Sequence, residues 1–432
     1  MKIIFHGAAQ EVGKSCIEIA IDNKRYLLDA GIKFIQHGVE YPKELDKING
    51  LDGIFLSHAH LDHSGALPML EHKELNCPIY MTDLTWKTTN MLLEDSYHLA
   101  KLKHIHPAYV GRDIDKVKKD LKIVRYDQEY KTRDSNIKFQ FINAGHIPGS
   151  ASILMKIKDK TILYTGDINT ENTNLMIPSQ LENLKNEIDI LITENTYGDR
   201  MHPDKILSEE GFIKSIENCI RGGGSALVPV FGVGRSQEIL IILSKLDPKI
   251  PIYLDGMARK LTQTMIQSND KFINNVDLLE KMFKRVTLIT NPKDRLSIAK
   301  RKGIVILTTS GMVQGGPVMS YADTMIHNKD NFILLTGYQA NGTNGRSIFE
   351  DHMFYNHHHR FPVKAHVRKF DFSAHYGQDK IHNLIEKLNP KHLILQHGDT
   401  SAISAVSQWI KNKSKFKGKV YTPIIGETIN FE

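Results

Sequence analysis

The stretch Ser57-His58-Ala59-His60-Leu61-Asp62-His63-Ser64-Gly65 decides how the rest of the sequence is interpreted. It directly follows the apolar run Ile54-Phe55-Leu56, which is typical of a buried strand. His58 and His60 are two residues apart, so in extended backbone both side chains point the same way and can share one cation. The pair Asp62-His63 follows as the chain turns toward a helix, and it can face a second cation. Imidazole and carboxylate groups at a strand end predict a zinc site.

Three later segments repeat this context, with a polar side chain next to glycine at the end of an apolar strand. They place His146 after Ala144-Gly145, Asp167 after Thr165-Gly166, and His397 before Gly398-Asp399. Loops at one edge of a sheet gather on one rim, so these side chains are expected to join the first group. Asp29 has the same context and is expected to orient a ligand histidine rather than to bind metal. Taken singly, a buried or solvated histidine is the better interpretation of His146 and of His397.

The order of expected elements divides the chain into three segments. Residues 1–201 contain many short strands and few helices, which predicts stacked layers with helices outside. Residues 202–362 alternate strands with helices, which predicts a second domain built on a mainly parallel, doubly covered sheet. Residues 363–432 return to strands with a helix between them. A helix is also expected over residues 85–103, with four residues on its buried side: Met91, Leu92, Leu99 and Leu102.

Composition and residue pattern indicate a globular protein without membrane spans, a signal peptide or disulfides. The 432 residues are 41% hydrophobic and 24% charged, which is ordinary for globular domains. No apolar run approaches the roughly 20 residues of a membrane span, and the start lacks a signal-peptide pattern, so no membrane association is expected. Three widely spaced cysteines favour neither disulfides nor a cysteine zinc site. Cysteines without disulfides are typical of the reducing cytoplasm. The net charge of +7 is compatible with binding to a polyanion.

These motifs are similar to those of the metallo-β-lactamase superfamily and, within it, of the β-CASP nucleases. The superfamily signature is matched by His58-x-His60-x-Asp62-His63, and the β-CASP motifs by Glu194 in Glu194-Asn195-Thr196-Tyr197-Gly198, His375 in Phe372-Ser373-Ala374-His375, and His397. The opening residues 7–16 resemble the endonuclease subunit of the mRNA 3′-end cleavage factor, in the short archaeal and bacterial form without KH domains. The implied fold is α/β: a metallo-β-lactamase αββα sandwich with an inserted β-CASP domain. Residues after about 363 would return to the first domain.

The resemblance also implies a role for each site residue. One Zn2+ would be bound by His58, His60 and His146, the other by Asp62, His63 and His397, and Asp167 would bridge the two ions. Asp29 would bind no metal itself and would orient one of the ligand histidines. The catalytic residues would be Asp62, His375 and Glu194: a hydroxide between the ions attacks phosphorus, and His375, held by Glu194, protonates the leaving oxygen. Ser373 and Arg346 are candidate contacts for an RNA phosphate, with a structural salt bridge as the alternative for Arg346.

The implied function is zinc-dependent hydrolysis of phosphodiester bonds in single-stranded RNA, by endonuclease action, five-prime to three-prime exonuclease action, or both. A cytoplasmic enzyme is expected, and a homodimer stays open because relatives often dimerise. Three alternatives stay open: a DNA nuclease of the same branch, an enzyme acting on a small thioester or lactam, and a non-catalytic partner in an RNA-processing complex. The DNA branch usually has Val where His397 stands, which favours RNA. Tyr376-Gly377 depart from the Ala-Asp of many relatives, which leaves the hydrogen bonding there unpredicted.

Overall fold

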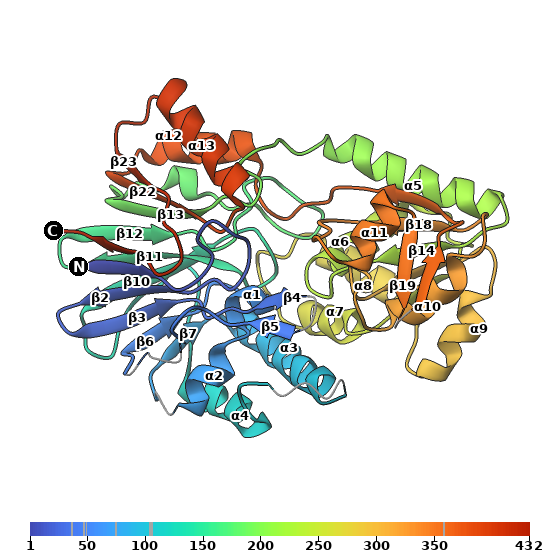
Figure 1. The fold of residues 1–432 in the computed structure, drawn as a ribbon, viewed down its shortest axis with the longest axis horizontal. Coiled ribbons are helices and arrows are strands. Elements are labelled where there is room, and N and C mark those ends of the chain that lie inside the picture. Colours follow the sequence, from blue (N-terminus) through green and yellow to red (C-terminus); the bar gives the residue numbers. More distant parts are fainter. Residues whose placement is uncertain (36–37, 46–47, 49, 74–75, 103–106, 357–358) are drawn as a thin grey trace. The chain divides into compact units, whose positions relative to one another are not determined.

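The computed structural model describes residues 1–432 except 36–37, 46–47, 49, 74–75, 103–106 and 357–358. The described chain forms two compact units (Figure 1). Unit 1 comprises Met1–Asn172, Ile177–Met201 and His375–Glu432, and unit 2 comprises Thr173–Met176 and His202–Ala374. Apart from the short segment Thr173–Met176, the chain enters unit 2 after Met201 and is back in unit 1 from His375.

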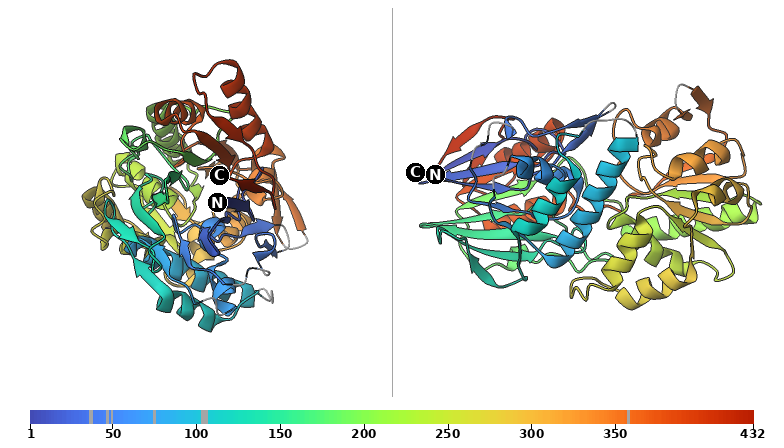
Figure 2. Two further views of the ribbon diagram at one scale, coloured as in Figure 1. Left: turned by 90° about the vertical axis from the view of Figure 1, so that its left-hand side faces the viewer. Right: turned by 90° about the horizontal axis from the view of Figure 1, so that it is seen from below.

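Two seven-stranded sheets form the centre of unit 1. The first has the order β24-β1-β2-β3-β6-β7-β8, with bounds β24 Thr428–Asn430, β1 Lys2–Phe5, β2 Ile17–Ile21, β3 Lys24–Leu28, β6 Gly53–Phe55, β7 Ile79–Met81 and β8 Leu121–Ile123. The second has the order β23-β22-β13-β12-β11-β10-β9, with bounds β23 Lys419–Tyr421, β22 His392–Gln396, β13 Ile190–Glu194, β12 Lys160–Tyr164, β11 Ala151–Ile157, β10 Ile137–Asn143 and β9 Glu129–Lys131. Strand β1 pairs with β24, so the two chain ends lie side by side (Figure 2).

Period-two alternation along the strands builds the layers of unit 1. In β13, Ile190 and Ile192 face the core between the two sheets, whereas Leu191 faces a second core on the outer side. In the first sheet, Phe55 of β6 lies in the same central core and Ile54 faces outward. Both faces of each sheet are thus apolar, and each outer face must be covered by helices.

Helices cover both outer faces of unit 1 and complete four layers (Figures 1 and 2). On the first sheet lie α1 Leu61–Ser64, α2 Leu67–His72, α3 Asp83–Leu102 and α4 Gly111–Asp120, and on the second lie α12 Gln378–Leu388, α13 Thr400–Asn412 and the 3-10 turn η2 Leu181–Asn183. A small hairpin, β4 Lys33–Ile35 and β5 Gly38–Glu40, precedes β6. The αββα prediction is confirmed. None of the helices among the described residues has the length and apolar character that a membrane span requires.

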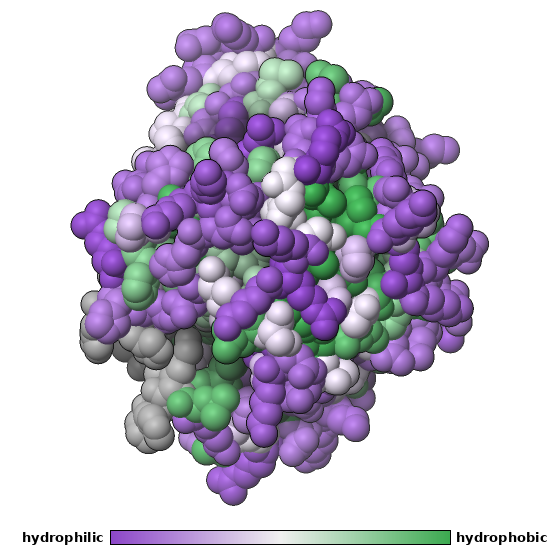
Figure 3. Space-filling model, turned by 90° about the vertical axis from the view of Figure 1, so that its right-hand side faces the viewer, coloured by the Kyte–Doolittle hydropathy of each residue, from purple (hydrophilic) through white to green (hydrophobic). Residues whose placement is uncertain are grey.

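Unit 2 is built on a six-stranded sheet of order β16-β15-β17-β14-β18-β21 in which all pairs are parallel. Its strands are β14 Ala226–Pro229, β15 Ile252–Asp255, β16 Thr287–Leu288, β17 Val305–Thr308, β18 Phe332–Leu335 and β21 His366–Lys369, with a hairpin of β19 Met353–Asn356 and β20 His359–Pro362. Its helices are α5 Lys205–Arg221, α6 Arg235–Ile242, α7 Ala258–Ile266, α8 Val276–Arg285, α9 Arg295–Ala299, α10 Val318–Met325 and α11 Asn344–Glu350, with 3-10 turns η3 Leu243–Lys245 and η4 Pro292–Asp294. The face shown in Figure 3 is mostly hydrophilic, with smaller hydrophobic areas between.

The return to unit 1 lies later than the boundary expected at residue 363. Strand β21 pairs in parallel with β18 from Phe332↔His366 to Leu335↔Lys369, so residues 366–369 belong to the sheet of unit 2. The strand was anticipated from the sequence, but its partner was not, because strand pairing is a long-range choice that local pattern does not encode.

Helix α3 also shows where local pattern fails. The expected helix over residues 85–103 corresponds to Asp83–Leu102, but the expected buried side is wrong, since Leu99 is 37% and Leu102 62% exposed. The buried positions are instead Leu84, Thr85, Thr88, Thr89 and Leu93. A threonine-rich stripe carries a weak apolar signal even when it faces the core.

A buried carboxylate in unit 1 makes the free energy of unfolding depend on pH. Glu18 of β2 is 1% exposed and accepts hydrogen bonds from Arg25 Nε at 2.7 Å and Nη2 at 2.9 Å, with His6 Nε2 at 2.9 Å. Burial alone would raise its pKa, but the bonds from His6 and Arg25 outweigh burial and lower the pKa to about 2. An acid with a lowered pKa stabilises the fold above its unfolded pKa of about 4.3, and this contribution is lost as pH falls toward 2.

We therefore expect Glu18→Gln to lower the free energy of unfolding by roughly 3 kcal/mol at pH 7, because Arg25 loses a buried ionic partner. Urea unfolding between pH 2 and pH 7 measures this, and the gap between wild type and variant should close toward pH 2. Glu129→Gln, at an exposed position, is the control. A gap that is constant over the whole pH range would contradict this account.

Candidate active site

The seven expected metal ligands converge in unit 1, at the loops that follow its strands. His58 and His60 lie between β6 and α1, Asp62 and His63 lie in α1, His146 lies between β10 and β11, Asp167 follows β12, and His397 follows β22. Five of them are at most 3% exposed: His58, His63, His146, Asp167 and His397. The structure thus brings together all seven residues that the sequence singled out.

Close backbone packing holds the histidine motif in place. The Ser15 amide donates to the Asp62 carbonyl at 2.7 Å, and the Ala30 amide donates to the His63 carbonyl at 2.7 Å. A Cβ on Gly31 would lie 1.6 Å from the Asp62 carbonyl oxygen, so only glycine allows this approach. The loop after β3 therefore positions the start of α1.

The first ligand group has the spacing of a tetrahedral site. His60 Nδ1 lies 3.2 Å from both His58 Nε2 and His146 Nε2, and Asp167 Oδ2 lies 3.5 Å from His58 Nε2 and 3.6 Å from His146 Nε2. Donors bound at about 2.0–2.1 Å to one tetrahedral zinc ion lie about 3.3 Å apart. Burial lowers the pKa of His58 and His60, which keeps both imidazoles neutral, as ligands must be.

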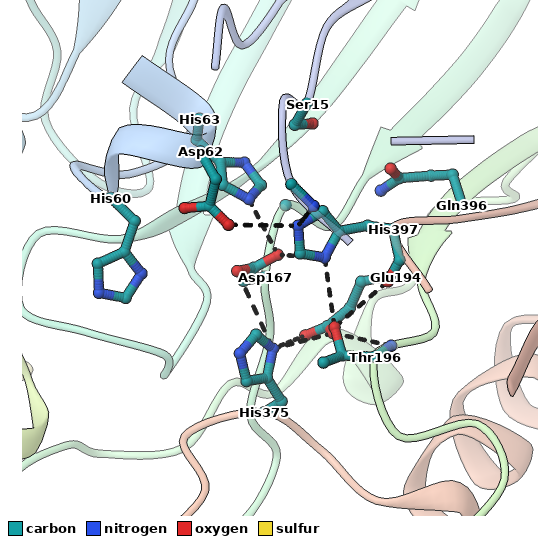
Figure 4. Close-up of polar contacts among 12 residues, drawn as sticks. Ser15, His60, Asp62, His63, Asp167, Glu194, Thr196, His375, Gln396 and His397 are labelled. Carbon is teal, nitrogen blue, oxygen red and sulfur yellow. Dashed lines mark hydrogen bonds and ion pairs between the residues drawn. The ribbon is translucent and has the colours of Figure 1, made fainter. Parts of the chain in front are cut away.

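The second group uses the other oxygen of Asp167 (Figure 4). Asp167 Oδ1 lies 3.3 Å from His63 Nε2 and 3.4 Å from His397 Nδ1, and His397 Nε2 lies 3.6 Å from Asp62 Oδ2. His63 Nε2 and Asp167 Oδ1 are buried and have no hydrogen-bond partner among the described residues. Buried polar atoms are rarely left unpaired, so a cation between them fits this donor set. Asp167 thereby faces both groups with one oxygen each.

Asp29 lies behind the second group and accepts four hydrogen bonds. Its oxygens accept from His63 Nδ1 at 2.7 Å, Tyr164 OH at 2.6 Å, the Ser57 amide at 2.7 Å and the Ser57 hydroxyl at 2.8 Å. Because Nδ1 of His63 donates to Asp29, Nε2 keeps the lone pair that a cation needs. Asp29 and His397 both have positive φ, 60° and 47°, which is uncommon outside glycine.

We expect Asp29→Asn to weaken metal binding at the second group by about 10- to 100-fold, because the amide cannot accept His63 Nδ1–H as a carboxylate does. Asparagine tolerates the positive φ, so the backbone should be kept. Competition with a chromogenic chelator measures the affinity. Asp127→Asn, an exposed position with φ of 63°, is the matched control. Equal affinity in wild type and Asp29→Asn would refute the role of Asp29.

His375 and Glu194 form a pair beside the bridging carboxylate. His375 Nδ1 lies 2.9 Å from each oxygen of Glu194 and 3.9 Å from Asp167 Oδ2. The Ile168 amide donates to Glu194 Oε1 at 2.8 Å, so the residue after Asp167 also fixes this carboxylate. Burial lowers the pKa of His375, but Glu194 and Asp167 outweigh burial and raise it to about 9, which favours the imidazolium.

The contacts within the pair favour a hydrogen bond over a third metal site. Asp167, Glu194 and His375 offer ligand atoms within 4.8 Å of one another. However, Glu194 already accepts from the Ile168 amide and from the Thr196 hydroxyl at 2.5 Å. The 2.9 Å contacts with His375 are hydrogen-bond distances, shorter than the spacing of ligands around one cation.

Two residues that contact the site were not identified from the sequence, Tyr376 and Thr196. Tyr376, where relatives often have alanine, is 1% exposed, and its hydroxyl contacts Thr193 Oγ1 and donates to the Glu194 carbonyl at 3.2 Å. Thr196 lies within the quoted Glu194 motif, but nothing in the motif distinguishes its hydroxyl from that of any loop threonine. Such contacts depend on tertiary placement.

The two candidate RNA contacts lie in unit 2. Arg346 Nε forms an ion pair with Glu350 Oε2 at 2.5 Å along α11, which is the structural alternative that the sequence left open. Ser373 is half-buried shortly after β21.

Three family models match successive parts of the chain. Residues 18–196 match the metallo-beta-lactamase superfamily domain, residues 236–348 match the Beta-Casp domain, and residues 360–423 match the Zn-dependent metallo-hydrolase RNA specificity domain. Their order along the chain is the order that the sequence motifs predicted.

Individual proteins agree with these models. The chain is 40% identical to "Probable RNase MJ4" of Methanocaldococcus jannaschii, over 99% of this chain and 100% of that protein. It is 28% identical to "Cleavage and polyadenylation specificity factor 73" of Drosophila melanogaster, over 92% of this chain and 60% of that protein. A crystal structure of a protein of unknown function from Enterococcus faecalis V583 shares the fold, with a TM-score of 0.64, 14% identity and 99% of both chains covered.

These matches and the clustered ligands confirm the family resemblance. The whole-length relative at 40% identity extends it from the motifs to the complete chain. The chain belongs to the metallo-β-lactamase superfamily, in its β-CASP branch, and is a metal-dependent hydrolase.

Proposed function

We propose that this protein is a zinc-dependent ribonuclease that hydrolyses phosphodiester bonds of single-stranded RNA, with His375 as general acid. The broader class, a metal-dependent ribonuclease, is given by the family and by relatives named as RNases. The observation that carries the finer proposal is the placement of Asp167, which faces both ligand groups while the His375–Glu194 pair lies beside it.

Zinc suits the donor set because all seven donors are imidazole nitrogens or carboxylate oxygens. His58, His60 and His146 would hold one ion, Asp62, His63 and His397 the other, and Asp167 both. When bound, two such ions supply activation of water near neutral pH and positive charge next to the phosphoryl oxygens. Asp29 keeps His63 in the tautomer that can bind, through the 2.7 Å contact at Nδ1.

The remaining chemistry belongs to His375 and Glu194. A sugar oxygen leaves poorly as an alkoxide, so the reaction needs a proton donor at that atom. Glu194 holds Nδ1 of His375 through both oxygens, which fixes the ring plane and stabilises the protonated ring. His375 then gives its proton to the leaving oxygen and recovers one from water, with Glu194 as its fixed partner.

The proposal is tested with labelled single-stranded and duplex RNA, wild type and His63→Ala. We expect metal-dependent cleavage of the single strand by wild type only. Cleavage by both proteins would contradict the proposed centre, and preference for duplex would contradict the substrate. End-labelled RNA with five-prime triphosphate, monophosphate or hydroxyl ends then separates the modes, since an endonuclease gives internal products and an exonuclease releases mononucleotides.

A further inference from the structure

The hydroxyl of Thr196 lies between the carboxylate of Glu194 and the ring of His397 (Figure 4). Thr196 Oγ1 donates to Glu194 Oε2 at 2.5 Å and lies 3.3 Å from His397 Nδ1 and from the His397 carbonyl oxygen. The Thr196 amide is also directed at Glu194 Oε2, at 3.4 Å. One side chain therefore contacts both the carboxylate that holds His375 and a residue of the second ligand group.

The direction of these hydrogen bonds follows from the number of protons. A hydroxyl has one proton, and Thr196 donates this proton to the Glu194 carboxylate in the short contact. Oγ1 can then only accept from His397, and Asp167 Oδ1 at 3.4 Å is a second acceptor beside the same nitrogen, so Nδ1 of His397 carries the ring proton. The other ring nitrogen agrees, because the Gly13 amide points its N–H at His397 Nε2 from 3.3 Å. Nε2 therefore bears the lone pair, and it faces Asp62 Oδ2 at 3.6 Å. A cation bound at Nε2 would take this lone pair in place of the 3.3 Å contact from Gly13.

We propose that Thr196 is a positioning residue that acts on both halves of the site through one hydroxyl. It fixes the tautomer of His397, so that Nε2 is the atom offered to the second cation, and it fixes the Glu194 carboxylate against which His375 is aligned. The second effect rests on the proposed acid role of His375, and the first does not. A fixed supporting contact of this kind is worth about 10- to 100-fold in metal affinity or activity.

The alternative is that Thr196 is an ordinary loop residue, whose hydroxyl only completes the hydrogen bonds of the turn after β13. Hydroxyls of serine and threonine often bond to nearby groups in turns without further consequence. The two interpretations differ in what the hydroxyl changes. A turn contact affects stability, whereas a positioning contact affects metal affinity and the step that needs a proton.

The test compares Thr196→Val, which keeps the shape and removes the hydroxyl, with Thr196→Ser, which keeps the hydroxyl. Metal affinity is measured by chelator competition. At saturating Zn2+, kcat and KM are measured on single-stranded RNA and on bis(p-nitrophenyl) phosphate, whose nitrophenolate leaves without protonation. The control is Thr88→Val, since Thr88 is buried and its hydroxyl has no hydrogen-bond partner among the described residues.

For Thr196→Val we expect about 10-fold weaker binding of the second metal equivalent and, at saturating metal, a 10- to 100-fold lower kcat on RNA with little change in KM. The nitrophenyl substrate should change by less than about 3-fold, because the acid is not needed. Thr196→Ser should stay within about 3-fold of wild type in every measurement. The control should do the same.

Three outcomes would overturn the proposal: wild-type metal affinity in Thr196→Val, equal losses in the Ser and Val variants, or equal losses on both substrates at saturating metal. Failure of the proposed function is recognised separately. If His375→Ala cleaves RNA as fast as wild type does, the proposed acid role of His375 is refuted. The metal affinity of Thr196→Val then still tests whether Thr196 positions His397.

Discussion

His375→Ala should lower kcat on single-stranded RNA by about 10²- to 10⁴-fold, the range that a positioned general acid contributes. The same variant should hydrolyse bis(p-nitrophenyl) phosphate at nearly the wild-type rate, because its leaving group needs no proton. The physical reason is the fixed pair at the site, in which His375 Nδ1 is held 2.9 Å from both oxygens of Glu194. Steady-state kinetics on the two substrates, at saturating metal, measures the difference.

The control for this result is His98→Ala, an exposed histidine on α3. Glu194→Gln should follow His375→Ala in direction, since the amide no longer stabilises the imidazolium. Equal losses on both substrates would mean that His375 supports the metal centre rather than the leaving group. No loss on RNA would remove His375 from the reaction.

Asp167→Ala should abolish RNA cleavage, with a loss on the order of 10³-fold or more, because metal ions in such sites contribute several kcal/mol of charge stabilisation. Asp167 faces His58 and His146 through Oδ2 and His63 and His397 through Oδ1. Asp167 is 2% exposed, so the variant removes a buried carboxylate that faces both groups.

This prediction is checked by kcat/KM on RNA together with isothermal titration of Zn2+ into metal-free protein. Both binding events should weaken, since one side chain serves both groups. Asp159→Ala, in the exposed turn between β11 and β12, is the control for loss of an acidic residue. Weakening of only one binding event would show that Asp167 belongs to one group alone.

The sequence predicted the ligand set well because its signals are local. His58, His60, Asp62 and His63 lie in one short stretch, and their strand-end context recurs at His146, Asp167 and His397. The αββα layers also follow from local pattern, since alternation such as that of Ile190, Leu191 and Ile192 assigns each side chain to a face.

The parts that could not be predicted depend on contacts between distant segments. Strand β21 joins β18 of unit 2 rather than returning at once to unit 1, and α3 buries a threonine stripe instead of its leucines. Tyr376, which departs from the family pattern, contacts Thr193 and the Glu194 carbonyl from 183 and 182 residues away in the chain. The sequence alone places such residues next to a motif, and only the fold shows what they touch.

The most direct test of the account is the metal content of the purified, unchelated protein, measured by mass spectrometry for wild type, Asp167→Ala and Asp159→Ala. The two ligand groups that Asp167 faces, one with each oxygen, predict close to two divalent ions per chain in wild type and in Asp159→Ala, and a clear fall in Asp167→Ala. A wild-type protein that holds no divalent ion after supplementation with Zn2+, or an Asp167→Ala variant that holds as much as wild type, would contradict it.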